Sequence, residues 1–238
     1  MILGVVADDF TGGTDVASML VRAGLRTVQV IGVPQEAQAP EADAVVVALK
    51  SRTAPPEEAV RDALAAWRWL HAAGARQCYF KYCSTFDSTH QGNIGPVAEA
   101  LLAEFGCDFT VACPSLPGNG RTVYGGHLFV GDQLLSDSSM RQHPLTPMTD
   151  SNLVRVLQAQ VQGRVGLVRD DVVRAGAAEI CRRFAELRKD GVRFAVCDTT
   201  ATDQLEALAE ACRPLLLALK SGNFGGVDFF VKALALTQ

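Results

Sequence analysis

Two adjacent carboxylates lie close to the start of the chain, where an apolar run ends in Asp8 and Asp9 and continues as Phe-Thr-Gly-Gly-Thr-Asp. Capping a helix requires only one carboxylate, so a second one beside it is costly unless something binds to it. Aspartates in this position accept hydrogen bonds from sugar hydroxyls or take a proton as a general base. The stretch therefore predicts a site for a hydroxylated ligand at the end of the first strand.

Further polar residues follow other apolar runs of the sequence. Arg52 comes after "ADAVVVAL", Arg121 lies in "PGNGRT", and the stretch "FKYCSTFDSTHQGNIG" contributes Lys81, Ser84, Asp87, Ser88, Gly92 and Asn93. In an open parallel sheet, ligands bind beyond the carboxyl ends of the strands. Arginine and lysine there suit a carboxylate, and the backbone N–H groups of helix starts near Gly12 and Gly92 suit an anion. Together these groups indicate a small, polyhydroxylated acid as the ligand.

The elements that must position these residues alternate in type. "ILGVVA" precedes a helical pattern through "TDVASMLVRAG", and the helical stretch "PPEEAVRDALAAWRWLHAAG" begins with prolines and acids and ends at Gly74, as helix start and stop rules require. This alternation predicts an α/β fold with a mostly parallel sheet flanked by helices. "RTVYGGHLFV" predicts a small hairpin insertion that turns at Gly125-Gly126. The alternation then resumes, with a later strand that ends in Asp198-Thr199-Thr200.

The composition is that of a globular protein, with 238 residues of which 48% are hydrophobic and 20% charged. A net charge of −4, without clusters of Lys and Arg, argues against a nucleic-acid or membrane partner. Seven cysteines without a CxxC pair predict small core residues in a reducing compartment, and no zinc or other metal site. Because the chain starts with a strand-like run, not a basic leader, we expect a cytoplasmic protein.

Structural roles compete with several of these interpretations. Asp15 is as typical of a helix N-cap as of a ligand, and Lys50 and Arg52, taken alone, are typical of solvated charges. Cys83 and Ser84 have no nearby histidine to activate them, so nucleophilic catalysis is disfavoured.

Four stretches in order resemble the four-carbon acid sugar kinases, the family of the 3-oxo-tetronate, threonate and erythronate kinases: "ADDFTGGTD", "KYCSTFDSTHQGNIG", "PSLPGNGRTVYGGHLFV" and "SDSSMRQHPLTPMTDSNL". The resemblance is greatest to the 3-oxo-tetronate kinases. It implies a two-domain kinase that uses ATP and Mg²⁺, whose N-terminal domain holds the acid. It also implies catalytic roles for Asp8, Asp9 and Asp87, leaving open which is the base, and a substrate pocket containing Thr11, Gly12, Arg52, Lys81, Ser84, Ser88, Gly92, Asn93 and Arg121.

The last part of the chain departs from that family pattern. The family's Gly-Gly-Glu-Thr-Ser-like nucleotide loop is absent, and "LEALAEACRPL" runs directly into "LALKSGNFGGVDFFVKAL", which resembles the family's extreme C-terminus. We therefore expect a sugar-acid-binding α/β domain at residues 1–213 and a remnant of the nucleotide-binding domain at 214–238, joined by an internal deletion. The resemblance implies nucleotide contacts at Ser221, Gly222, Asn223 and Gly225, although "SGNFGG" is equally typical of a plain turn.

Three functions remain open on this sequence. The first is an ATP-dependent kinase for 3-oxo-tetronate or a related tetronate, impaired by the loss of most of the nucleotide domain. The second is a non-catalytic module that binds a sugar acid, and the third is a regulatory partner of a full-length relative. A homodimer would be a way to supply part of a nucleotide site.

Overall fold

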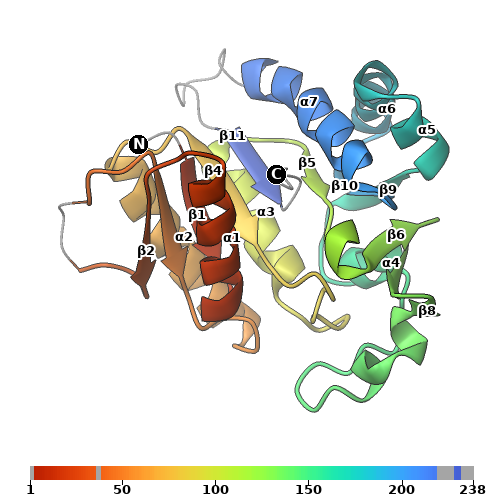
Figure 1. The fold of residues 1–238 in the computed structure, drawn as a ribbon, viewed down its shortest axis with the longest axis horizontal. Helices are drawn as coiled ribbons and strands as arrows, with labels where there is room; N and C mark the ends of the chain where they lie inside the picture. The colour runs from red at the N-terminus through yellow and green to blue at the C-terminus, as the bar shows by residue number, and fades with distance from the viewer. Residues whose placement is uncertain (1–2, 36–38, 219–227, 232–238) are drawn as a thin grey trace.

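A parallel β-sheet of eight strands forms the centre of the fold (Figure 1). The computed structural model describes residues 3–35, 39–218 and 228–231. In these ranges the strand order is β2-β3-β1-β4-β11-β5-β10-β9, and every pair is parallel. The strands are β1 (Leu3–Ala7), β2 (Thr27–Ile31), β3 (Ala44–Ala48), β4 (Gln77–Lys81), β5 (Thr110–Ala112), β9 (Arg164–Val168), β10 (Val192–Cys197) and β11 (Asp228–Val231).

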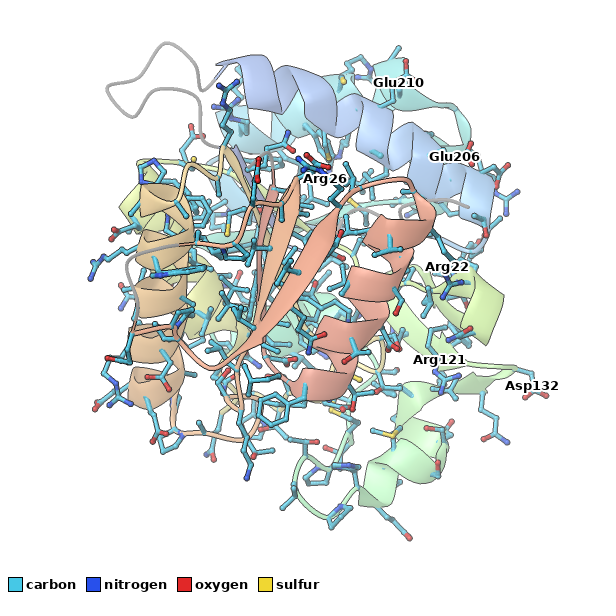
Figure 2. All side chains as sticks on the ribbon, turned by 60° about the vertical axis from the view of Figure 1, so that its left-hand side comes forward. Arg22, Arg26, Arg121, Asp132, Glu206 and Glu210 are labelled. Carbon is cyan, nitrogen blue, oxygen red and sulfur yellow. The ribbon has the colours of Figure 1, made fainter. Side chains whose placement is uncertain are left out.

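Helices cover both faces of this sheet, which explains why β1 and β3 are apolar at every position. The helices are α1 (Phe10–Arg22), α2 (Pro56–Ala72), α3 (Ile94–Phe105), α4 (Leu153–Gln158), α5 (Asp170–Arg174), α6 (Ala177–Lys189) and α7 (Thr202–Ala218). One core joins the sheet to α2, α3 and α4, and a second joins it to α1, α6 and α7. Charged residues such as Arg22, Glu206 and Glu210 lie outside these cores, exposed on the helices (Figure 2). The predicted α/β class is confirmed.

A small antiparallel sheet extends from one end of the main sheet, as the sequence predicted. It contains β6 (Arg121–Tyr124), β7 (His127–Val130) and β8 (Gln133–Leu134). The short helices η1 (Pro117–Asn119), η2 (Leu135–Asp137) and η3 (Ser139–Gln142) flank it. Gly125 and Gly126 form the hairpin turn with φ of 59° and 77°, a conformation that glycine adopts without steric cost.

The last described strand lies in the middle of the main sheet. β11 pairs with β4 on one side and with β5 on the other, and the helix α7 continues through positions 213 and 214. The boundary expected between residues 213 and 214 stays a prediction. In the described ranges, no helix combines the length and the apolar character that crossing a bilayer requires.

Candidate functional site

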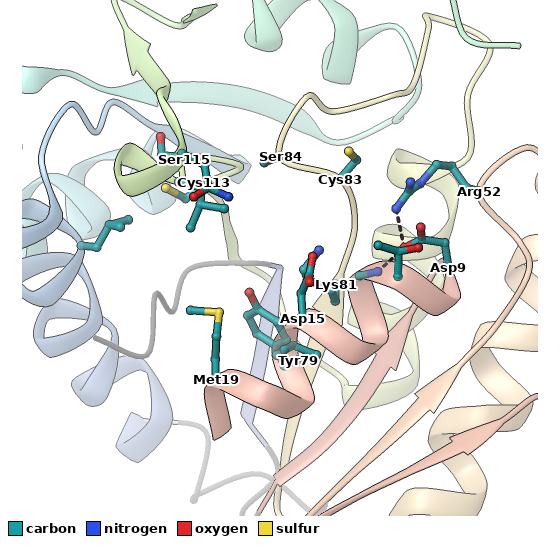
Figure 3. Close-up of a pocket in the computed structure, with 16 residues that line it drawn as sticks. Asp9, Asp15, Met19, Arg52, Tyr79, Lys81, Cys83, Ser84, Cys113 and Ser115 are labelled. Atoms are coloured by element: carbon teal, nitrogen blue, oxygen red, sulfur yellow. Dashed lines mark hydrogen bonds and ion pairs between the residues drawn. The ribbon is translucent and has the colours of Figure 1, made fainter. Parts of the chain in front are cut away.

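A cavity of about 160 Å³ opens beyond the carboxyl ends of β4 and β5, beside the first turns of α1 (Figure 3). After β1 the chain continues to β2 on one side of the sheet, and after β4 it continues to β5 on the other side. Open α/β sheets bind ligands where the direction changes in this way. Six of the predicted site residues line the cavity: Asp9, Thr11, Gly12, Arg52, Lys81 and Ser84.

Asp9 fixes the start of helix α1. Its backbone is extended (φ −147°), and its Oδ1 accepts a hydrogen bond of 2.9 Å from the backbone N–H of Gly12, as an N-cap does. The helix therefore begins at Phe10, earlier than the sequence pattern indicated, and Asp15 lies inside it on the cavity wall. A Cβ on Gly12 would lie 2.6 Å from the Asp9 Oδ1 and 2.9 Å from the Lys81 Nζ, so a side chain at position 12 would displace the Asp9 carboxylate and the Lys81 ammonium from these positions.

Arg52 is held by carboxylates. Its Nε and Nη2 donate to the two oxygens of Asp8 at 3.1 and 2.8 Å, and Nη2 lies 2.6 Å from the Asp9 Oδ1. Its Nη1 lies 3.6 Å from an oxygen of Asp87. Burial raises the pKa of Asp8 and the bond to Arg52 opposes this effect. Burial lowers the pKa of Arg52, but the hydrogen bond and charge of Asp8 outweigh it and raise the pKa overall. Arg52 therefore stays charged, and carboxylates of the protein already pair with its guanidinium nitrogens.

Lys81 differs from Arg52 in forming no ion pair with a carboxylate among the described residues, and its charge makes only a small contribution that lowers the pKa of Asp8. Its Nζ donates to the carbonyl oxygen of Tyr82 at 3.0 Å and lies against Gly12 in the first turn of α1. A helix N-terminus carries a partial positive charge, so an ammonium placed there is electrostatically unfavourable by itself. An anion between the two would be attracted by both.

Five other predicted residues form a layer behind the cavity. Asn93 donates to the carbonyl oxygens of Ser51 and Ala54 at 2.7 and 3.0 Å and so fixes the loop that carries Arg52. Asp87 accepts a 2.7 Å hydrogen bond from the Thr85 hydroxyl. The residues of this layer are Asp8, Asp87, Ser88, Gly92 and Asn93, and none of them lines the cavity.

Gln160, which the sequence pattern did not single out, supports this layer from the turn that follows α4. Its amide oxygen accepts from the Gly95 N–H at 2.7 Å, and its amide nitrogen donates to the Ser88 hydroxyl at 2.9 Å. A Cβ on Gly92 would lie 1.9 Å from that hydroxyl oxygen. No local sequence pattern identifies Gln160, because it lies far in the sequence from Ser88 and Gly95, which it contacts.

Arg121 lies apart from the other predicted site residues. It begins β6, in the small sheet (Figure 2), and its Nη1 donates to the carbonyl oxygen of Asn119 at 2.6 Å. Asn119 lines the cavity, whereas Arg121 does not. The predicted nucleotide contacts Ser221, Gly222, Asn223 and Gly225 fall outside the described residues.

The cavity also has walls that the sequence analysis did not assign to a site. Figure 3 shows Cys113 and Ser115 across the cavity from Asp9 and Arg52, with Met19 and Tyr79 at a third side. Met19 lies in α1 and Tyr79 in β4, where the apolar pattern predicts only packing, and Cys113 and Ser115 lie in the loop that follows β5. The order of the strands in the sheet brings these residues to one cavity. The remaining lining residues are Asp15, Val16, Cys83, Leu116, Asn119 and Leu205.

The cysteines form no disulfide bond, and most of them are buried. All seven are free, and five of them are buried, as small core residues are expected to be. Cys83 shares a hydrogen bond with the Thr85 hydroxyl at 3.0 Å. Within the described ranges, no three His, Cys, Asp or Glu side chains gather in a way that would hold a metal ion.

Fold and cavity together define an α/β domain with a cavity at the carboxyl ends of its strands, and comparison with known proteins identifies its family. The family model described as "Sugar-binding N-terminal domain" matches residues 3–224, so the chain belongs to that family. Curated proteins similar to this chain include 3-oxo-tetronate kinases. The one from Burkholderia multivorans is 60% identical over 216 residues, which are 91% of this chain and 50% of that protein. The one from Haemophilus influenzae is 52% identical and covers 94% of this chain and 54% of that protein. The chain thus spans about half the length of the curated relatives it matches.

Solved structures share the fold. A Haemophilus influenzae protein has a TM-score of 0.88 and 49% identity, and the match covers 98% of this chain and 54% of that one. A Bordetella bronchiseptica domain of unknown function, solved with bound citrate as a domain-swapped dimer, has a TM-score of 0.77 and 29% identity. That match covers 99% of this chain and 56% of the other. The predicted family is therefore confirmed.

Proposed function

We propose that this chain carries the acid-binding site of an ATP-dependent kinase whose substrate is 3-oxo-tetronate or a related four-carbon sugar acid. The observation that carries the proposal is the position of Lys81. Its ammonium lies against the first turn of α1 without a carboxylate partner among the described residues. A substrate carboxylate placed there would pair with Lys81 and with the positive end of the helix.

Asp9 is the carboxylate best placed to accept a substrate hydroxyl. Its Oδ1 is occupied by Gly12 and Arg52, while no hydrogen bond or ion pair among the described residues uses its Oδ2. Asp9 also lines the cavity, whereas Asp8 and Asp87 do not. We therefore assign the role of base to Asp9, which would take the proton of the hydroxyl as its oxygen attacks a phosphoryl group. Asp8 and Asp87 then act by holding Arg52.

ATP supplies the phosphoryl group in this proposal, with Mg²⁺ on its phosphates. The names of the curated relatives support the kinase assignment, and Ser221, Gly222, Asn223 and Gly225 remain the proposed nucleotide contacts. The citrate bound to the Bordetella relative supports a carboxylic acid as the ligand. The domain-swapped dimer of that relative supports a homodimer here, and the free cysteines support a reducing, cytoplasmic setting.

Calorimetric titration with 3-oxo-tetronate and the tetronates tests the binding site. We expect Lys81→Met to abolish acid binding and Asp9→Asn to weaken it, while Lys50→Met, a control on an exposed lysine outside the cavity, leaves it unchanged. Acid binding that survives Lys81→Met would contradict the assignment. Release of ADP from MgATP in the presence of the acid then separates a kinase from a binding module, because the module binds the acid without releasing ADP.

A further inference from the structure

Asp198 is a buried carboxylate at the end of β10 that the proposed chemistry does not use. It is 1% exposed, and its partners are backbone N–H groups. Gly125 and Gly126 each donate to it at 2.8 Å, and Asp170 donates at 3.1 Å. No ion pair among the described residues includes Asp198. Burial raises the pKa of this carboxyl, and the three backbone N–H groups oppose that effect.

The three donors come from elements that are far apart in the sequence. Gly125 and Gly126 form the turn between β6 and β7, and Asp170 is the first residue of α5. A single carboxylate therefore ties the tip of the small sheet to the main sheet. Because a buried backbone N–H such as that of Gly126 needs an acceptor, this side chain contributes to the docking of the hairpin.

The residue after Asp198 continues the connection to the cavity. The backbone of Thr199 pairs with Val123 of β6 in both directions, at 2.9 and 2.8 Å. Its carbonyl oxygen accepts from the Ser115 hydroxyl at 3.2 Å, and its own hydroxyl lies 3.3 Å from the Cys113 Sγ. Cys113 and Ser115 line the cavity on the side opposite Asp9 and Arg52 (Figure 3).

The loop that precedes β6 completes the same wall. Leu116 and Asn119 line the cavity, and the loop is closed by paired backbone hydrogen bonds between Leu116 and Arg121 at 2.8 and 3.1 Å. Since Arg121 begins β6, a shift of β6 relative to β10 would carry Leu116 and Asn119 with it.

We propose that Asp198 is a positioning residue that sets the place of the cavity wall facing Asp9, and thereby the length of acid that the cavity accepts. This proposal rests on the proposed function. Under this proposal, a four-carbon acid anchored at Lys81 and Asp9 would extend toward Ser115 and Leu116, which line the same cavity, whereas a two-carbon hydroxy acid would be too short to contact them. Selectivity for the longer acid then depends on the hairpin being docked.

The test compares Asp198→Asn with Asp170→Asn. The control removes a neighbouring carboxylate whose side chain contacts Arg174, Gln204 and Thr200, not the hairpin. We expect Asp198→Asn to lower the affinity for a tetronate by about tenfold or more and to leave that for glycolate unchanged, and Asp170→Asn to change neither. Equal losses for both acids, or no loss, would overturn the proposal.

Amide hydrogen exchange provides a measurement that needs no ligand. In Asp198→Asn the N–H groups of Leu116 and Asn119 should exchange faster, while those of β1 and β3 should not. Unchanged exchange at Leu116 and Asn119 would overturn the positioning role of Asp198, whether or not the wild-type chain binds an acid. Failure of the wild-type chain to bind any acid would instead refute the proposed function and leave the exchange result valid.

If Asp198→Asn does not fold, Gly126→Ala provides the same test. The φ of 77° at position 126 strains an alanine and shifts the turn, while Asp198 stays in place. Selective loss of tetronate binding supports the proposal, and its absence contradicts it.

Discussion

The guanidinium of Arg52 and the carboxylate of Asp8 form a two-point ion pair, with N–O distances of 3.1 and 2.8 Å. The pair connects the loop after β3 to the end of β1, and Asp9 and Asp87 approach the same guanidinium. Arg52 therefore neutralises a group of acids beside the cavity, and under the proposed function Lys81 is the cation that binds the ligand. Arg52 and Lys81, both predicted from the sequence to lie in the pocket, thus differ in their contacts.

Removal of Arg52 should destabilise the fold strongly. Arg52→Gln leaves the buried Asp8 without its partner, and breaking a buried ion pair from one side costs about 3 kcal/mol or more. Urea unfolding of the variant measures this loss. Arg68→Gln, which breaks the pair of Arg68 with Glu104 at the surface, is the matched control and should cause a much smaller loss, because exposed pairs are screened by water. Comparable losses of unfolding free energy in the two variants would show that the Arg52 ion pair does not stabilise the fold more than a surface pair.

Asn93 should affect acid binding without touching the acid. Asn93→Ala removes the hydrogen bonds that hold the Ser51–Ala54 loop and leaves buried carbonyl oxygens unpaired, at a cost of about 1–3 kcal/mol. We expect weaker acid binding together with lower stability, because Arg52 and with it Asp9 lose their fixed positions. Full affinity for the acid in a folded Asn93→Ala chain would mean that the loop does not position Arg52.

Gly92 and Ser88 should be energetically coupled. A Cβ at position 92 would collide with the Ser88 hydroxyl oxygen, so Gly92→Ala should cost about 1–3 kcal/mol. In a Ser88→Ala background that oxygen is gone, and the same substitution should cost less. A double-mutant cycle of unfolding free energies measures the difference, and additive effects would show that the contact is unimportant.

The pair of Asp43 and Arg26 should contribute to stability in a defined pH window. The side-chain hydrogen bond from Arg26, followed by its backbone N–H, lowers the pKa of Asp43 from 3.8 to about 2. A lowered carboxyl pKa stabilises the folded state above the unfolded value of 3.8, and this stabilisation is lost as the pH falls toward 2. The difference in urea midpoint between the wild type and Asp43→Asn should therefore shrink from pH 3.8 to pH 2, and a constant difference would argue against the pair.

The sequence predicts the α/β class and the strand ends that carry polar residues, because local periodicity and helix signals are strong in this chain. It does not predict which of those residues face the cavity. Four polar residues of one stretch, Lys81, Asp87, Ser88 and Asn93, suit a ligand site equally well by their side chains. In the structure, however, Ser88 contacts Gln160 and Asn93 holds the Ser51–Ala54 loop. Asp87 is bound by the Thr85 hydroxyl. The helix start at Phe10 was missed because two glycines follow it, which are unfavourable in a helix but are required here by close packing. The insertion of β11 between β4 and β5 depends on the sheet as a whole, so no local pattern reveals it.

A crystal structure of the chain with a bound tetronate would show directly which side chain holds the carboxylate of the acid. We expect this carboxylate to lie within about 3 Å of the Lys81 Nζ, at the first turn of α1, with a hydroxyl hydrogen-bonded to Asp9 and the far end of the acid toward Ser115. An acid whose carboxylate is bound by Arg52 or Arg121, with Lys81 left free, would contradict it.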